Sequence, residues 1–433
     1  MKKYRFRAAM AVVIANMIGT GVFTSLGYQL EVIRSPFALL MLWVFGGIAA
    51  LCGAMSYAEL GAAMPRSGGE YNFLSRIYHP AVGFISGWTS ALIGFAAPIA
   101  LAAILFGTYF VSIFPDVGKD SWVVKILAVA LLLIMTLIHS SNHKNSGATQ
   151  SIFTALKIIF IIGFCGAALW LVPEPQMIHI LPNMDDAKLM TSGAFAVSLI
   201  YVSYAYTGWN AATYLSGEVE NPQQNLPKIL FLGTLVVMLA YVALNYMFLK
   251  VAPIEAMTGK LEIGFIAAEY AFGPVGAKFI GFALAFLLIS TVSAMVIAGP
   301  RVMQVLGEDF SLFHIFSKTN ADGIPVNAIW LQTALAAGFI LTSSFERILV
   351  IAGSLLALSS FATVLGLFVL RWKQPELARP YRVWAFPIPP LLYLVLTGFT
   401  LVFVAKTRPM DAGIALVVIL SGLLFYLLVN RRK

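Results

Sequence analysis

Two polar interruptions in otherwise apolar segments carry the residues best suited to bind a ligand. Residues 17–21 read Met-Ile-Gly-Thr-Gly, and residues 204–210 read Tyr-Ala-Tyr-Thr-Gly-Trp-Asn. Glycine and polar residues in the middle of an apolar helix predict a break, which leaves backbone N–H and C=O groups without their intrahelical partners. In an apolar environment these groups need another polar partner. We therefore expect both segments to bind a polar ligand.

Chain direction gives the two breaks opposite polarity. The outer half of the first helix begins at Gly21, where free N–H groups and a partial positive charge suit a carboxylate. The second broken helix is expected to run the other way, so its outer half ends at residues 204–207 with free carbonyls. Together with the carbonyls of Met17 and Ile18, these suit an ammonium group. The pair predicts a cavity for a zwitterion, an α-amino acid above all.

Lys157 is a third candidate because of its depth. It lies about ten residues into the apolar stretch 147–171, and a rise of about 1.5 Å per residue puts its ammonium near the middle of a membrane. A charge at that depth is costly unless protein groups pair with it or solvate it. We expect a functional partner for Lys157, whereas Lys278, near a helix end, can extend its ammonium to the interface.

The composition predicts an all-α membrane protein that crosses the bilayer many times. The 433 residues are 60% hydrophobic and only 11% charged, and the mean hydropathy is +0.87. Twelve apolar stretches are long enough to span a bilayer. They are residues 8–29, 37–63, 82–114, 122–140, 147–171, 190–217, 227–250, 274–304, 325–343, 347–370, 386–405 and 411–430.

The distribution of basic residues predicts the orientation. With the N-terminus inside, cytoplasmic segments hold 17 of the 28 Lys and Arg residues and external segments hold nine. Both ends are thus expected to be cytoplasmic, in a cell (inner) membrane. The net charge of +9 is scattered over loops, so we expect no nucleic-acid partner.

The residue inventory argues against several other functions. Cys52 and Cys165 fall inside predicted spans and are expected to be unpaired thiols, and the five histidines show no metal-ligand spacing, so no metal and no cofactor is predicted. No metalloprotease motif, P-loop or pair of intramembrane carboxylates is present, so an enzyme is not expected. A channel is a remote alternative, which uptake and conductance measurements would distinguish from a carrier.

The breaks fall in the first and sixth predicted spans, the spacing expected of two five-helix repeats with inverted topology. The predicted units are residues 1–185 for the first repeat, 186–374 for the second, and 375–433 for helices 11 and 12 with the C-terminus. Residues 95–103 of helix 3 and 352–359 of helix 10 are expected to line the side-chain part of the cavity.

Three motifs resemble the amino acid–polyamine–organocation superfamily, whose members share a five-plus-five inverted-repeat fold like that of the leucine transporter. The run Ile18-Gly19-Thr20-Gly21-Val22-Phe23 resembles its helix 1 signature. Residues 57–61 with 65–71 resemble its helix 2 end and first cytoplasmic loop. Residues 208–210, followed by 218–222 and 225–227, are similar to the L-type amino acid transporter branch. The resemblance covers essentially the whole chain and implies a neutral amino acid transporter.

That resemblance implies roles for the residues of both breaks. The amides of Thr20 and Gly21 would bind the carboxylate, and the Tyr204 ring would be the outer gate. The amino group would be bound by the carbonyls of Met17 or Ile18 and of Tyr204 and Thr207. Trp209 and Asn210 would lie just below. The candidate binding residues are Met17, Ile18, Gly19, Thr20, Gly21, Tyr204, Ala205, Thr207, Trp209 and Asn210.

The resemblance also places Lys157 where related transporters bind sodium. Its ammonium would reach the carbonyl of Gly19 and the hydroxyl of Ser293, so transport is expected to be independent of sodium. Lys157 serves either amino acid exchange or proton-coupled symport, and both remain open. The substrate is expected to be a neutral, small or medium L-amino acid, because no acidic or basic residue other than Lys157 lies in the central third of helices 1, 3, 6, 8 and 10.

Two further expectations concern the loops. Glu59, Arg66 and Glu70 could form salt bridges that hold the loop between helices 2 and 3, or could act directly in gating. Residues 112–122, between helices 3 and 4, contain no cysteine. We therefore expect no disulfide-linked heavy chain and a monomer or weak homo-oligomer.

Overall fold

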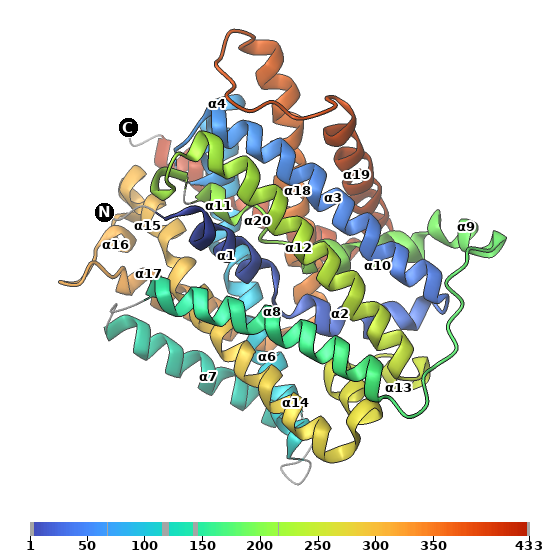
Figure 1. Ribbon diagram of the computed structural model, residues 1–433. Helices are drawn as coiled ribbons and strands as arrows, with labels where there is room; N and C mark the ends of the chain where they lie inside the picture. The colour runs from blue at the N-terminus through green and yellow to red at the C-terminus, as the bar shows by residue number, and fades with distance from the viewer. Residues whose placement is uncertain (1–3, 67, 115–120, 142–145, 215, 431–433) are drawn as a thin grey trace.

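The regular secondary structure in the described part of the chain consists of helices (Figure 1). The computed structural model describes residues 4–66, 68–114, 121–141, 146–214 and 216–430. In these residues a single isolated bridge pairs Tyr4 with Val219. The fold is all-helical, as the composition predicts.

The long helices follow the predicted apolar stretches. Ten helical segments in the described residues are long and apolar enough to cross a membrane, and α10 and α17 are shorter apolar helices at two further predicted spans. In chain order the main helices are α1 (Phe6–Met17), α2 (Gly21–Val32), α3 (Pro36–Ala63), α5 (Pro80–Thr89), α6 (Ala96–Ile113), α7 (Ser121–Ser141), α8 (Ser146–Leu171), α10 (Gly193–Ala205), α12 (Pro222–Val251), α14 (Ile263–Ala298), α17 (Val326–Thr342), α18 (Phe345–Lys373), α19 (Ile388–Thr407) and α20 (Pro409–Asn430).

Shorter helices connect these spans. They are α4 (Gly69–Ile77), α9 (Met184–Met190), α11 (Ala211–Tyr214), α13 (Ile254–Met257), α15 (Pro300–Asp309) and α16 (His314–Ser317), with short 3₁₀ turns at Ser216–Glu218 and Ser311–Phe313. The sequence did not indicate the π-helical turn η1 (Ser90–Gly94) between α5 and α6. Such turns occur often at functional sites.

The two predicted breaks are present and face each other. The first broken helix consists of α1 and α2, and the second of α10 and α11. α2 packs against α10, while α1 packs against α11 and α12. Gly21 makes the closest approach, because a Cβ built on it would lie 2.5 Å from the Cα of Ala205. A side chain at that position would push α2 and α10 apart.

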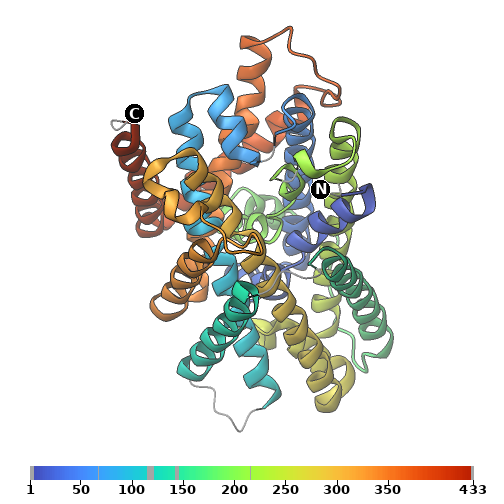
Figure 2. The ribbon, with the colours of Figure 1, turned by 90° about the vertical axis from the view of Figure 1, so that its left-hand side faces the viewer.

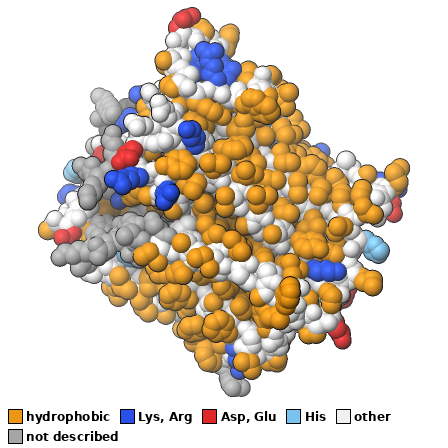
Figure 3. Space-filling model, viewed as in Figure 1, with side chains coloured by type: hydrophobic (Ala, Val, Ile, Leu, Met, Phe, Trp, Pro, Cys, Tyr) orange, Lys and Arg blue, Asp and Glu red, His pale blue; other side chains and the backbone are white. Residues whose placement is uncertain are grey.

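The surface fits an apolar surrounding. In Figure 3 hydrophobic side chains cover the middle of the visible face, and several Lys and Arg side chains gather toward its left and upper edges. Large side chains of α8 and α14 are exposed, such as Ile162 (66%) and Phe279 (75%). Both chain ends lie at the left of Figure 1 and face the viewer in Figure 2. They therefore lie on one side of the molecule.

Glu59, near the C-terminal end of α3, binds the end of α18 and the segment that follows it. Its carboxylate is fully buried and accepts hydrogen bonds from Nε (2.9 Å) and Nη2 (2.6 Å) of Arg371 and from the N–H of Val383 (2.7 Å). Arg379 lies 3.6 Å from the same carboxylate. The salt bridges of Glu59 therefore join α3 to the end of α18 and the segment beyond, and its cations do not include Arg66 of the loop between helices 2 and 3.

Glu59→Gln should lower the free energy of unfolding by about 3 kcal/mol, because removal of one partner leaves a buried cation uncompensated. Glu376→Gln removes the same charge from an exposed site and should change stability by less than about 0.5 kcal/mol. Unfolding of both variants in detergent micelles measures the difference. Equal stability of the two would contradict the assigned role of Glu59.

Candidate functional site

The first break presents free backbone donors. α1 ends at Met17, and Ile18 (ψ 86°) turns the chain out of the helix before α2 begins at Gly21. In the described part of the chain, no acceptor is found for the N–H groups of Thr20 and Gly21, whereas the N–H of Gly19 donates to the hydroxyl oxygen of Tyr241. These residues line the main cavity. Free amides at the start of α2 therefore face a space that an anion can enter.

The second break presents free acceptors. α10 ends at Ala205, and Gly208, with φ +97°, turns the chain before α11. A side chain at Gly208 would meet the backbone of Asn16 at 2.8 Å. Both the positive φ and this close contact therefore require glycine at the turn. Among the described residues, the carbonyls of Tyr206 and Thr207 accept no hydrogen bond. The carbonyl of Tyr204, which was expected to bind the amino group, instead accepts from the N–H (2.9 Å) and the hydroxyl (2.7 Å) of Thr207. The partial negative charge expected at the end of α10 is therefore available to a cation.

Tyr241 of α12 joins the two breaks, and sequence reasoning missed it. Its hydroxyl donates to the carbonyl of Met17 and lies 3.2 Å from the carbonyl of Ala205. The side chain is fully buried. A tyrosine in the middle of an apolar span was the available signal, because a buried phenol needs a polar partner. Tyr241 thus occupies one lone pair of the Met17 carbonyl, which was expected to bind the ammonium group of the ligand.

Lys157 contacts the first break, but through partners other than those predicted. Its Nζ donates to the carbonyl of Ile18 (3.2 Å) and to Oγ1 of Thr291 on α14 (2.9 Å), and the residue is 3% exposed. Ser293 was the wrong hydroxyl, since it pairs with Nε2 of His139 at 2.8 Å. Two residues along a helix is a rotation of about 200°, which turns Ser293 to another face.

The carbonyl of Gly19 was likewise the wrong acceptor for Lys157. The chain leaves its helical path at Ile18, and this turn directs the Ile18 carbonyl toward α8. A separate small cavity of about 10 Å³ lies beside the ammonium, lined by Gly19, Tyr109, Thr291 and apolar side chains. That volume holds about one water molecule. Lys157 therefore lies behind the break and outside the main cavity.

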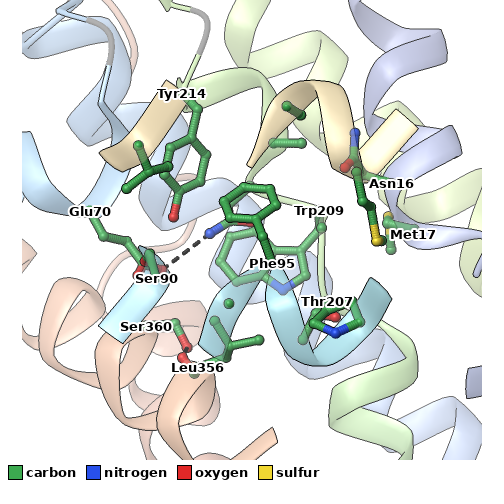
Figure 4. Close-up of a pocket in the computed structure, with 18 of the residues that line it drawn as sticks. Asn16, Met17, Glu70, Ser90, Phe95, Thr207, Trp209, Tyr214, Leu356 and Ser360 are labelled. Carbon is green, nitrogen blue, oxygen red and sulfur yellow. Dashed lines mark hydrogen bonds between the residues drawn. The ribbon is translucent and has the colours of Figure 1, made fainter. Parts of the chain in front are cut away.

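The main cavity has a volume of about 550 Å³, within the range of small-molecule sites. Figure 4 shows Phe95, Trp209 and Leu356 around its interior, with Ser90 and Ser360 among them. Phe95 and Leu356 belong to the segments predicted to line it. Of the predicted binding residues, the cavity is lined by Met17, Gly19, Thr20, Gly21, Tyr204, Ala205, Thr207, Trp209 and Asn210, but not by Ile18, Lys157 or Ser293.

The cavity extends toward the side of the molecule that carries the N-terminus. Its lining includes Tyr4 and, on α15, Arg301 and Asp309. The opposite side is closed, because the Tyr28 ring of α2 packs on Tyr201 of α10 at 5.7 Å. The neighbouring loop also seals this side, where the N–H of residue 259 donates to the carbonyl of residue 27 at 2.9 Å. The breaks are therefore accessible from one side only.

Glu70 is a carboxyl group in the cavity wall that was not predicted to belong to the site. It accepts hydrogen bonds from the hydroxyl of Tyr57 (2.5 Å), Nδ2 of Asn210 (3.1 Å) and the hydroxyl of Ser359 (2.6 Å). Burial raises the pKa of Glu70, while these hydrogen bonds act against the rise. The sequence placed Glu70 in a loop, so the expectation of few charges in the helix centres did not cover it.

Comparisons with known proteins show the family of this chain. A family model described as "Amino acid permease" matches residues 4–425. The Asc-type amino acid transporter 1 of Mus musculus is 28% identical over 440 residues, covering 97% of this chain and 80% of the relative. The human "Large neutral amino acids transporter small subunit 2" is 28% identical over 442 residues, covering 97% of this chain and 79% of the relative.

A bacterial relative matches over almost its whole length. The "Serine/threonine exchanger SteT" of Bacillus subtilis (strain 168) is 27% identical over 432 residues, covering 98% of this chain and 96% of the relative. The family match spans nearly the entire chain, and these relatives confirm the resemblance that the sequence motifs indicated. The chain belongs to the amino acid permease family, within the L-type branch of the amino acid–polyamine–organocation superfamily.

Proposed function

We propose that this protein exchanges neutral L-amino acids across the cell membrane by alternating access and without sodium. The observation that carries the proposal is the pair of opposite backbone ends in one cavity. The free amides of Thr20 and Gly21 suit the carboxylate of an amino acid, and the free carbonyls of Tyr206 and Thr207 suit its ammonium. Because these groups are backbone atoms, they select the part that all amino acids share.

The cavity walls favour a neutral side chain. Phe95, Trp209 and Leu356 supply apolar surface around the interior. Glu70 also lines the cavity, and its carboxylate already accepts three hydrogen bonds. A charged substrate side chain would lose its hydration against Phe95, Trp209 and Leu356 and gain no countercharge from them. This supports small or medium neutral amino acids.

Lys157 supports independence from sodium. Its ammonium donates to the Ile18 carbonyl and the Thr291 hydroxyl, two oxygens of the kind that bind a hard cation. A fixed positive charge there repels sodium. Exchange is favoured over proton-coupled symport by the likeness to a relative whose name calls it an exchanger.

The architecture that we propose is two inverted repeats, residues 1–185 and 186–374, with helices 11 and 12 in residues 375–433. It comprises twelve spans with both ends cytoplasmic, and the crossed packing of α1 on α11 and α2 on α10 supports it. The open side of the cavity is then the cytoplasmic side. The absence of a heavy chain also remains a proposal, and residues 115–120 of the relevant loop lie outside the described residues.

Proteoliposomes test the function directly. Uptake of labelled alanine, serine or leucine should require an unlabelled neutral amino acid inside the vesicles, and choline in place of sodium should not change the rate. Arginine and glutamate should compete weakly. Equal competition by charged amino acids would overturn the substrate class, and uptake into empty vesicles driven by an inward proton gradient would favour symport.

Lys157→Ala should slow exchange about tenfold or more, because a charged hydrogen bond that shapes the break is worth about 1.5–3 kcal/mol. Lys278→Ala is the matched control, since Lys278 is exposed on α14 and should exchange at the parent rate. Initial rates, normalised to the amount of reconstituted protein, give the comparison. Parent-like exchange by Lys157→Ala would refute the role assigned to its ammonium.

Gly19→Ala and Gly21→Ala should fail in different ways. A Cβ at Gly19 meets only the Met17 carbonyl oxygen, at 3.9 Å, whereas one at Gly21 lies 2.5 Å from Ala205. Gly21→Ala should therefore lower stability by about 1–3 kcal/mol through overpacking. Gly19→Ala should keep the fold, because its Cβ has room, and weaken amino acid binding about tenfold, because Gly19 lines the cavity and the added methyl group would crowd the carboxylate beside the neighbouring amides.

Thermal unfolding and equilibrium binding, measured on the same preparations, separate the two effects. A side chain at Gly21 would not fill the carboxylate position, because that side of Gly21 faces α10. A Gly21→Ala protein as stable as the parent would show that α2 and α10 do not pack this closely.

A further inference from the structure

Glu70 joins three separate elements at the wall of the cavity. It is 2% exposed and lies on α4, next to the interior (Figure 4). Its Oε1 accepts from Tyr57 of α3 and from Asn210 in the break after α10, and its Oε2 accepts from Ser359 of α18. The Ser359 hydroxyl also pairs with Ser86 of α5 at 2.8 Å. One carboxyl group therefore ties the second broken helix to its surroundings.

No cation balances Glu70 in the described part of the chain, since none of its ion pairs includes this residue. On α18, Arg371 is held by Glu59. The titratable groups that face Glu70 are phenols of α3, α11 and α19, which are neutral at physiological pH; they are Tyr57, Tyr214 and Tyr393. The charged groups of the cavity lining are Arg66, Arg301, Glu308 and Asp309.

Protonation must change the hydrogen bonds of Glu70. An ionised carboxylate accepts all three bonds, whereas a protonated carboxyl has a donor of its own and accepts less. The hydroxyls of Tyr57 and Ser359 can turn and accept instead. Nδ2 of Asn210 can only donate, so a proton on Oε1 weakens the bond to Asn210 (the dashed line at Glu70 in Figure 4). That bond is the direct tie from Glu70 to the break.

We infer that Glu70 is a proton-binding site, which takes a proton from cavity water when the cavity closes and returns it when the cavity opens. Its protonation state then sets how firmly the segment after α10 is held. Ionisation is favoured while water fills the cavity, and loss of that water favours the neutral form. The inference rests on the proposed function, because amino acid binding is the event that displaces the water.

Infrared spectroscopy of the ligand-free protein tests the site without a substrate. In a pH titration, the wild-type protein should show a carboxylic-acid C=O band that persists above the ordinary pKa of glutamate, because burial raises the pKa of Glu70. Glu70→Gln should remove this band, and Glu376→Gln should keep it. Should Glu70→Gln not fold, Glu70→Asp should shift the band. A wild type without such a band, or a band unchanged in the Glu70 variants, would overturn the inference.

Calorimetry then links the proton to the amino acid. Binding of alanine or leucine, measured in buffers of different ionisation enthalpy, should take up as much as one proton per amino acid. The uptake should vanish in Glu70→Gln and persist in Glu376→Gln. Binding without proton exchange in the wild type, or equal uptake in Glu70→Gln, would contradict the coupling. Absence of any binding would count against the proposed function, while the infrared titration still decides whether Glu70 holds the proton.

Discussion

The site depends on the contact between the ammonium of Lys157 and the carbonyl of Ile18. An intact helix would use that carbonyl internally, and an isolated lysine at this depth would carry an unpaired charge in an apolar layer. The carbonyl that the break frees therefore accepts a hydrogen bond from the lysine, and the lysine gains a partner for its charge. The Thr291 hydroxyl completes the arrangement from α14, and it donates onward to the carbonyl of Leu287. Three helices thus meet at one cation.

Other contacts connect this centre to the second break. Tyr241 contacts carbonyls of both breaks, and Gly21 lets α2 lie against α10 at Ala205. A movement of one broken helix should therefore displace the other. On the open side of the cavity, Asn210 and Glu70 fasten the chain after the second break. Alternating access by this protein requires these ties to change while the backbone groups continue to hold the ligand.

The sequence predicted the features that depend on position along the chain. The depth of Lys157, the two breaks and their opposite polarity follow from spacing and helix direction alone. Features that depend on helix rotation could not be predicted, since Thr291 and Ser293 lie two residues apart but face different neighbours. The sequence did not predict Glu70 as a residue of the cavity wall for a related reason. It lies on a short helix outside the predicted spans, and only the folded chain brings it to the cavity wall.

A structure determined by electron microscopy with a bound neutral amino acid tests the central claim most directly. The account predicts the carboxylate at the amides of Thr20 and Gly21, the ammonium at the carbonyls of Tyr206 and Thr207, and the side chain toward Phe95 and Leu356. It also predicts that Lys157 keeps its contact with Ile18 and does not touch the ligand. An amino acid bound away from both breaks, or held by the ammonium of Lys157, would contradict it.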